Sequence, residues 1–381
     1  MKRRTLSVVM SLAMVATLFT GCGNSQTSST AEQSATSQTE QSSAASTEES
    51  SAVSSAASPT ESSATAETGT EGTDNTATYS DLELTEAEKE KANGLTIGVS
   101  YCLMSAPAVK VFAQGVEAEA KELGIEVIEL DGEWDAAKQA DQVNTFISQK
   151  VDGIVLNPCD GTSLVSAAKA GSDAGIPVVT GAMNIDESGY DYIKTFVGPD
   201  DADVGRAAAK SMMEALGEAG GKVAIIEGTA GSSAQVNRTA GFEEVVAGSN
   251  IEVVAKNSAD YDEATAMSIA EDLLTKYPDL KGVFCHDDTM ASGCVQAMKE
   301  LGYNGDDVKV VGYGGSAKGA SLVEEGYMVA TAVQPLVNEG RGCIKALVKA
   351  INGEDLSIWY KDEITPLDAS NVADYDKSLL W

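Results

Sequence analysis

One short stretch of the chain, GVFCHDDTMASG over residues 282–293, gathers residue types that could do chemistry. It holds His286, the only histidine among 381 residues, beside Cys285, Asp287 and Asp288. Imidazole, thiolate and carboxylate groups bind metals or move protons when they converge on one point. Adjacent strand residues point to opposite faces of a sheet, so His286 and Asp287 do not converge easily. We therefore predict no metal site here.

Motifs for other reactions do not strengthen the case for an enzyme. The chain contains no GxSxG, and a Ser-His-Asp triad would have to use His286 without any serine elbow around it. The turn GYGGSAKG (312–319) lacks the third glycine of GxGxxG and the GK[ST] ending of a phosphate loop. The turn GTAGSS (228–233) is only glycine-rich. We predict no catalytic residues and no cofactor.

The elements that must position these residues form a regular series from about residue 95 onward. Short Val- and Ile-rich strands alternate with amphipathic helices, and glycines such as Gly124, Gly175 and Gly302 follow helices as C-caps. This alternation predicts parallel sheets with helices on both faces. Two such series in succession predict an α/β fold with two Rossmann-like lobes. In such sheets ligands bind beyond the carboxyl ends of the strands.

Polar and aromatic residues stand at these strand ends and in the loops beside them. Amides, one carboxylate, one guanidinium and aromatic rings together suit a hydroxyl-rich ligand, because each hydroxyl both donates and accepts. Singly, each has a structural alternative as a helix cap, a core ring or an ion-pair partner. The predicted ligand-binding residues are Ser100, Trp134, Asn157, Asn184, Arg238, Tyr261, Asp287 and Gln334.

The N-terminus carries targeting signals rather than part of the fold. A basic MKRR and an apolar run over residues 5–19 lead to LFTGCGNS, which resembles a bacterial lipobox. Residues 1–21 are then a signal peptide, and an acylated Cys22 anchors the protein to the outer face of the cytoplasmic membrane. The alternative is an ordinary cleaved signal peptide with an incidental cysteine. Residues 22–90 are predicted to form a disordered Ser/Thr/Glu tether.

Charge and cysteine content exclude further classes of protein. The formal net charge of −32 repels nucleic-acid phosphates and anionic lipid, so we expect neither nucleic-acid binding nor membrane contact beyond the lipid anchor. Five cysteines remain after Cys22, without metal-type spacing. We predict that they are small buried hydrophobes. They are Cys102, Cys159, Cys285, Cys294 and Cys343.

Long stretches of the body resemble the periplasmic binding proteins of the ribose/galactose group, the solute receptors of ABC sugar importers. They include DGIVLNPCD, AGIPVVT, GTAGSSAQVNRTAGFEEVV and VVGYGGSAKGASLVEEGYMVATAVQ. The resemblance implies two lobes joined by three hinge crossings, with the solute between them. The lobes would be 95–198 plus 335–363 and 199–334 plus 364–381. It also implies a monomer that binds a small sugar or polyol and docks on a membrane permease.

Individual positions carry the resemblance further. Arg238 in NRTAGF matches a sugar-binding arginine, Tyr261 replaces a stacking phenylalanine, and Gln334 matches a hinge glutamine. Asp287 stands where an asparagine or aspartate bonds sugar hydroxyls. Ser100 and Asn157 follow strands as in the family.

The sequence also departs from the ribose receptors. An Asp-Arg pair is replaced by Ala182 and Met183, and an aspartate by Gly314. Two phenylalanines are replaced by Ala108 and Val109. These changes imply a roomier pocket, less charged on the first lobe, with Trp134, Tyr101 and Asn184 as replacements. A pentose, hexose, polyol, deoxy sugar or autoinducer-type furanose remains open.

Two other functions compete with import. The same fold could present an autoinducer-like or sugar ligand to a membrane kinase or chemoreceptor. A lipoprotein glycosidase would need two carboxylates facing each other, and only Asp287 is a candidate.

For the opening stretch, we predict that Asp287 contacts the ligand and that His286 faces into the lobe or its rim. Asp288 and Thr289 are expected to start and cap the next helix.

Overall fold

The computed structural model describes residues 75–381 of the chain. The predicted signal peptide, the lipidation site Cys22 and most of the predicted tether lie outside the described residues. Within the described part, no helix has the length and apolar character needed to cross a membrane.

Seven strands within residues 75–381 form the first sheet, in the order β1-β12-β6-β5-β4-β2-β3. All neighbouring pairs in it are parallel. Its central strands are rich in Val and Ile and almost fully buried, as a parallel sheet covered on both faces requires. The strands are β1 (Thr76–Ala77), β2 (Thr96–Tyr101), β3 (Glu126–Asp131), β4 (Gly153–Leu156), β5 (Val178–Gly181), β6 (Thr195–Gly198) and β12 (Trp359–Lys361).

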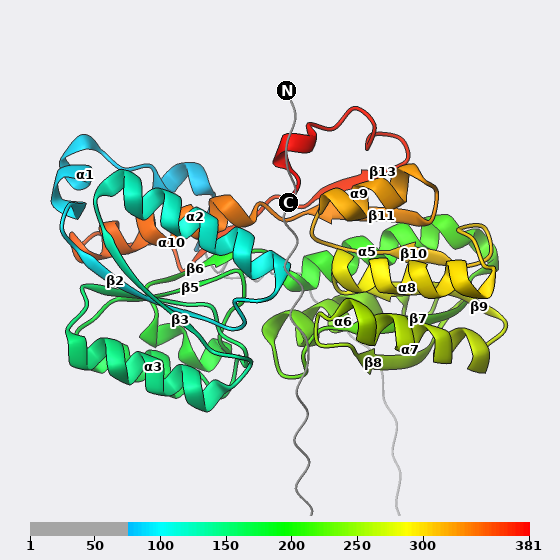
Figure 1. The fold of residues 1–381 in the computed structure, drawn as a ribbon, viewed down its shortest axis with the longest axis horizontal. Helices are drawn as coiled ribbons and strands as arrows, with labels where there is room; N and C mark the ends of the chain where they lie inside the picture. The colour runs from blue at the N-terminus through cyan, green and yellow to red at the C-terminus, as the bar shows by residue number, and fades with distance from the viewer. Residues whose placement is uncertain (1–74) are drawn as a thin grey trace, which may run out of the picture. The chain divides into compact units, whose positions relative to one another are not determined.

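Helices cover both faces of the first sheet, as Figure 1 shows. The helices α2 and α10 pack against each other on one face, and α3 and α4 pack against each other on the other. The helical segments of this lobe are η1 (Tyr79–Leu82), α1 (Glu86–Ala92), α2 (Pro107–Leu123), α3 (Ala136–Gln149), α4 (Val165–Asp173), η2 (Glu187–Tyr192) and α10 (Leu336–Ile351).

The second sheet has six strands in the described chain, in the order β13-β11-β10-β9-β7-β8. Its pairs are parallel except for the edge strand β13, which runs antiparallel to β11. The strands are β7 (Gly221–Glu227), β8 (Ile251–Ser258), β9 (Leu280–Cys285), β10 (Lys309–Val311), β11 (Met328–Val333) and β13 (Thr365–Asp368).

Helices cover both faces of the second sheet. The helices α5 and α6 pack together on one face, and α7, α8 and α9 lie on the other (Figure 1). The helical segments are α5 (Asp201–Leu216), η3 (Gly217–Ala219), α6 (Ser233–Val246), α7 (Glu263–Lys276), α8 (Asp288–Leu301), α9 (Ala317–Glu324) and η4 (Lys377–Leu379). The predicted two-lobed α/β fold with parallel sheets is confirmed.

Within residues 75–381 the chain passes between the two sheets three times. It crosses between β6 and α5, between β11 and α10, and between β12 and β13. The first crossing leads directly into the turn at Asp200, whose side chain accepts hydrogen bonds from the first backbone amides of α5. Each crossing begins at the carboxyl end of a strand of one sheet, namely β6, β11 or β12.

The folded part begins earlier than the predicted residue 95. Strand β1 pairs with β12, and helix α1 begins with a capping box in which Thr85 and Glu88 exchange hydrogen bonds. Leu82 and Ala92 are fully buried in the core of the first lobe. The prediction of a disordered tether through residue 90 is therefore wrong for residues 76–90.

Close packing of helix α5 against helix α6 positions Arg238. Gly205 on α5 lies directly against the backbone of α6 at Arg238, where an added Cβ atom would collide with the Arg238 carbonyl oxygen. Gly241 on α6 meets the backbone of α5 at Ala202 in the same way. The two backbones approach closely because neither position carries a side chain, and this contact fixes the position of Arg238.

Other local predictions are confirmed. Gly124 and Gly302 end α2 and α8 in the left-handed conformation, with φ of 71° and 81°. The five cysteines of the described chain are all buried and unbridged, as expected of small hydrophobes.

Candidate functional site

A cavity lies between the carboxyl ends of the two sheets, where the strand-end rule predicts a ligand site. Its empty space, including the part open to solvent, is about 650 Å³. Cys102, Asn157 and Met183 line it from the first sheet, and Asp287 and Gln334 line it from the second.

Arg238 stands at the centre of the second-lobe wall and is only 4% exposed. Its Nε donates to Oδ1 of Asp201 at 2.8 Å and its Nη1 donates to the carbonyl oxygen of His286 at 2.5 Å. The guanidinium also lies over the ring of Tyr313, 4.4 Å from the centroid. Among the described residues, nothing accepts a hydrogen bond from Nη2. That group is available to a ligand.

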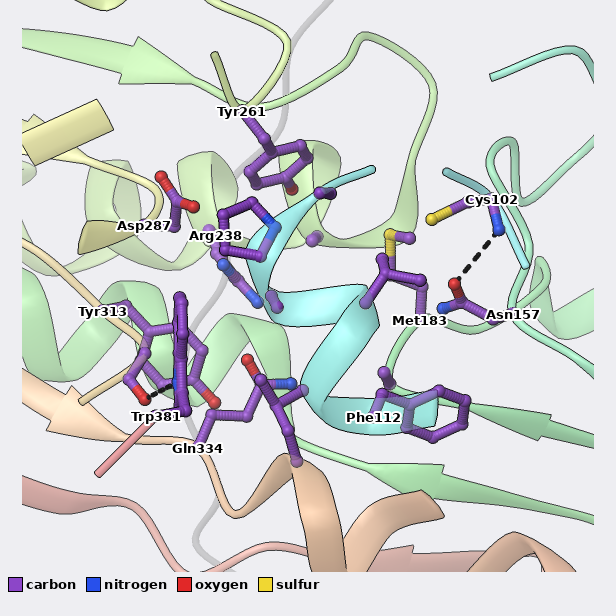
Figure 2. Close-up of a pocket in the computed structure, with 18 of the residues that line it drawn as sticks. Cys102, Phe112, Asn157, Met183, Arg238, Tyr261, Asp287, Tyr313, Gln334 and Trp381 are labelled. Carbon is purple, nitrogen blue, oxygen red and sulfur yellow. Dashed lines mark hydrogen bonds between the residues drawn. The ribbon is translucent and has the colours of Figure 1, made fainter. Parts of the chain in front are cut away.

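Asp287 lies beside Arg238 in the cavity wall, as Figure 2 shows, and also caps α8. Its Oδ1 accepts from the backbone amide of Met290 at 2.8 Å, and Oδ2 has no hydrogen-bond partner within residues 75–381. Burial raises its pKa to about 7, and the neighbouring Asp288 carboxylate adds to the effect. The helix begins at Asp288 as predicted, but its cap is Asp287 rather than Asp288 or Thr289.

Asp288 is just as buried, but its oxygens are occupied. Oδ2 accepts from the backbone amide and hydroxyl of Ser316, and Oδ1 accepts from the hydroxyl of Thr331 at 2.7 Å. These contacts join the start of α8 to the start of α9 and to β11. Asp288 is therefore a structural residue, and its carboxylate does not line the cavity.

Two aromatic residues from different lobes meet at the cavity. Trp134 of the first lobe stacks on Tyr261 of the second, with ring centroids 5.9 Å apart and an interplanar angle of 17°. Both have left-handed backbones, with φ of 56° and 57°. The indole Nε1 and the phenol oxygen are buried and lack any partner in the described part of the chain. Buried polar atoms of this kind are satisfied when a ligand or water binds.

Gln334 lines the cavity at the second crossing. Its Nε2 donates to Oε1 of Glu339 at 2.9 Å, while its carbonyl oxygen has no donor among the described residues. The glutamine therefore connects the cavity to the buried start of α10. This placement agrees with the predicted hinge position.

Ser100 lies outside the cavity, although it was predicted to contact the ligand. Its hydroxyl donates to Gln142 at 2.6 Å and accepts from Nε2 of Gln139 at 3.0 Å, inside the first lobe. Tyr101 also points away from the cavity and donates to Glu129 at 2.6 Å. Consecutive strand residues alternate in direction, and here the two side chains are drawn to helix α3 and strand β3.

Asn184 is likewise outside the cavity and lines a neighbouring hollow. Its Oδ1 accepts from the hydroxyl of Thr180 at 2.8 Å, and its Nδ2 donates to the hydroxyl of Tyr190 at 3.0 Å. Its backbone amide donates to Ser233 of the second lobe at 3.0 Å. Asn184 therefore holds the loop after β5 and contacts the other lobe.

Asn157 does line the cavity, but both ends of its amide are hydrogen-bonded to the first lobe. Oδ1 accepts from the backbone amide of Cys102 at 3.2 Å, and Nδ2 donates to the carbonyl oxygen of Gly181 at 3.0 Å. The structure thus brings six of the eight predicted residues together around the cavity and leaves Ser100 and Asn184 outside.

The rest of the first-lobe wall is apolar. Ala182 and Met183, which replace a charged pair of the ribose receptors, line it together with Val109, Phe112 and Leu336. Figure 2 shows Met183 and Phe112 on the opposite side of the cavity from Asp287 and Arg238. The expectation of a less charged first lobe is confirmed.

Trp381, the last residue, was not predicted to take part in the site. Its Nε1 donates to the carbonyl oxygen of Gly314 at 2.5 Å, and its indole covers the place where a side chain at Gly314 would lie. Its carbonyl oxygen accepts from the backbone amide of Ala317 at 2.7 Å. The glycine therefore does not make the pocket roomier there. The indole itself is the only signal that the sequence offers.

His286 faces away from the cavity, as predicted. Its Nδ1 accepts from the backbone amide of Gly228 at 3.3 Å, and its Nε2 lies 3.2 Å from the hydroxyl of Thr239. Burial, together with the Arg238 guanidinium, holds the pKa of His286 well below its usual range. A neutral ring packed inside the lobe, on Phe284, is not placed to move a proton to a ligand.

Comparison with known proteins agrees with this geometry. The sequence profile of the family described as "Periplasmic binding protein domain" matches residues 97–355. The chain is 35% identical over 240 residues to the ribose import binding protein RbsB of Bacillus subtilis, which covers 63% of this chain and 76% of that protein.

Two solved structures share the fold. An ABC transporter solute-binding protein from Bacillus halodurans with bound myo-inositol is 28% identical, with a TM-score of 0.71 and coverage of 76% of this chain and 99% of that one. Another, from Agrobacterium vitis with bound D-fucose, is 26% identical, with a TM-score of 0.70 and coverage of 75% and 99%. The chain therefore belongs to the periplasmic binding protein family as a two-lobed type I member, a solute-binding protein and not an enzyme.

Proposed function

We propose that this protein binds a neutral monosaccharide or polyol between its lobes and delivers it to an ABC permease. It would do so as a monomeric lipoprotein anchored through Cys22 outside the cytoplasm. One observation carries the proposal: polar atoms that have no hydrogen-bond partner within residues 75–381 converge on a single cavity from both lobes. They include Nη2 of Arg238, Oδ2 of Asp287, the hydroxyl of Tyr261 and Nε1 of Trp134.

The charges around the cavity favour a neutral ligand. The Arg238 guanidinium is paired with Asp201 at 2.8 Å, with both side chains buried. An anionic ligand would meet the carboxylate of Asp287, and a cationic one would meet the guanidinium. A hydroxyl can accept from Nη2 and donate to Oδ2 at once, so vicinal hydroxyls satisfy both groups.

Closure would couple binding to delivery. The lobes touch through the Trp134–Tyr261 stack at the cavity and through the hydrogen bond from Asn184 to Ser233 outside it. A ligand that bridges both walls stabilises the closed arrangement over an open one, in proportion to its contacts in that state alone. The closed form would then present both lobes to the permease.

The first experiment is isothermal titration calorimetry of the purified chain against monosaccharides and polyols, with small-angle scattering to follow closure. Micromolar binding with a decrease in the radius of gyration supports the proposal. A folded protein that binds none of them at millimolar concentration contradicts it. The anchor is tested separately: Cys22→Ser should release the protein from the membrane fraction, and unchanged retention argues against lipidation.

Delivery needs its own assay, in proteoliposomes that hold the candidate permease. The loaded protein should stimulate ATP hydrolysis and sugar uptake. Stimulation without uptake, or binding to a sensor kinase instead, would support a sensory receptor.

A further inference from the structure

The two walls of the cavity differ in what they offer a sugar, and this difference narrows the ligand class. This inference rests on the proposed function. The polar wall provides groups on Arg238, Asp287 and Tyr261 that lack a partner in the described part of the chain, with Trp134 beside them. The opposite wall consists of side chains from the start of α2, the loop after β5 and the start of α10. They are Val109, Phe112, Met183 and Leu336, all buried.

The first lobe offers the cavity few polar groups besides Nε1 of Trp134. The hydroxyl of Ser100 is bonded within the lobe, and the amide of Asn157 bonds the backbone at Cys102 and Gly181, which leaves it one N–H for the cavity. Asn184 does not line the cavity. A sugar hydroxyl pressed against Val109 or Phe112 therefore loses its water without gaining a partner, which weakens binding. A methyl group in the same place gains apolar contact.

Common hexoses carry hydroxyls around their whole rim, so a ring whose rim spans the two walls turns one hydroxyl to the apolar wall when the others meet the polar wall. Replacing the hydroxymethyl group with methyl removes one hydroxyl and leaves every hydroxyl on the ring in place. We infer that the ligand is a deoxy sugar, with a methyl group where common hexoses carry hydroxymethyl, and that this methyl contacts Val109, Phe112 and Met183.

The test compares sugars that differ only in this group. Calorimetry would use D-galactose, D-fucose and L-arabinose, which carry hydroxymethyl, methyl and hydrogen at the same carbon. It would add D-glucose, 6-deoxy-D-glucose and D-xylose, and the corresponding mannose and allose series. In the series that binds best, we expect the methyl member to bind at least tenfold more tightly than the hydroxymethyl member, with the hydrogen member between them.

The outcomes separate the two proposals. A hydroxymethyl or hydrogen member that binds as tightly as the methyl member overturns the deoxy-sugar inference and leaves sugar binding standing. A folded protein that binds no member of any series overturns the proposed function, and this inference with it.

A paired substitution tests the apolar wall directly. Val109→Thr adds a hydroxyl of nearly the same shape to the wall, and should reduce the preference for methyl over hydroxymethyl at least threefold. Val111→Thr is the matched control, on the same helix but outside the cavity, and should leave the preference unchanged. Circular dichroism would verify that both variants fold. An unchanged preference in Val109→Thr, or an equal change in both, overturns the assignment of this wall.

Discussion

The strand ends of the two lobes carry similar polar residues but use them differently. In the first lobe, Ser100 and Asn157 form hydrogen bonds with their own lobe, and these bonds hold helix α3 and the loops after β2 and β5. In the second lobe, Asp287 after β9 and Arg238 in the neighbouring helix α6 each use some atoms for structure and leave another facing the cavity. A polar residue at a strand end thus marks the site, but only its hydrogen bonds show whether it can reach a ligand.

The largest effect is expected at Arg238, which both holds the second lobe together and faces the cavity. Arg238→Met leaves Asp201 buried without a cation, so we expect a loss of about 3–5 kcal/mol of unfolding free energy, together with loss of sugar binding. Urea denaturation and calorimetry measure the two effects. Arg206→Met is the control, because its ion pairs with Asp203 and Glu244 are at the surface and contribute less than about 1 kcal/mol. Similar losses in both variants would contradict the central place of Arg238.

Asp288 should behave as a structural residue of the second lobe. Asp288→Asn replaces one acceptor oxygen with a donor that faces the Ser316 or Thr331 groups, so we expect about 2–3 kcal/mol of destabilisation. Sugar affinity in the folded fraction should change less than threefold. Thermal and urea denaturation measure the first quantity. A variant as stable as the wild type would show that these bonds contribute little.

Unlike Asp288, Asp287 should make the unfolding free energy depend on pH. Because burial raises its pKa to about 7, the ligand-free folded state holds this proton more tightly than the unfolded chain does. Its contribution to stability is full below the unfolded pKa of about 4 and is lost as pH rises through 7. Asp287→Asn keeps an oxygen for the cap and removes the buried charge. At pH 8 it should be more stable than the wild type by roughly 1–3 kcal/mol, and at pH 4 about equal.

Urea titrations of ligand-free wild type and Asp287→Asn from pH 4 to pH 8 measure this difference. A constant difference across the range would mean that the pKa of Asp287 is not raised.

The smallest effects are expected at Ser100 in the first lobe. Ser100→Ala removes one partner from each of two buried glutamines, Gln139 and Gln142, which should cost about 1–2 kcal/mol of stability. Affinity should change less than threefold, because the hydroxyl does not reach the cavity. A large fall in affinity with unchanged stability would mean that Ser100 contacts the ligand after all.

The fold could be predicted because its signal is repeated along the chain. Buried Val and Ile strands such as β4 and β5 recur between amphipathic helices, and each repeat supports the others. The segment over residues 76–92 was missed because β1 has two residues and α1 reads EAEKEKA, which has almost no apolar face. Its place is fixed by contacts with distant residues, such as the pairing of β1 with β12.

The site could be predicted in position but not in detail. The strand-end rule led to Asp287 and Gln334. The alternation of side chains along a strand predicted that His286 faces into the lobe. Hydrogen bonds to residues far away in sequence, as from Ser100 to Gln142, decide which polar groups face the cavity, and spacing carries no information about them. Trp381 lies 67 residues from its partner Gly314, so no local pattern connects the two.

Calorimetry on two variants tests the contrast between the lobes most directly. Asp287→Ala and Ser100→Ala would be titrated side by side with the sugar that the wild type binds best, at pH 8, where Asp287 carries its charge. Because Asp287→Ala removes the carboxylate that faces the cavity, we predict at least a hundredfold loss of affinity for it and less than a threefold loss for Ser100→Ala. Equal losses, or a larger loss for Ser100→Ala, would contradict the assignment of ligand binding to the second lobe's polar wall.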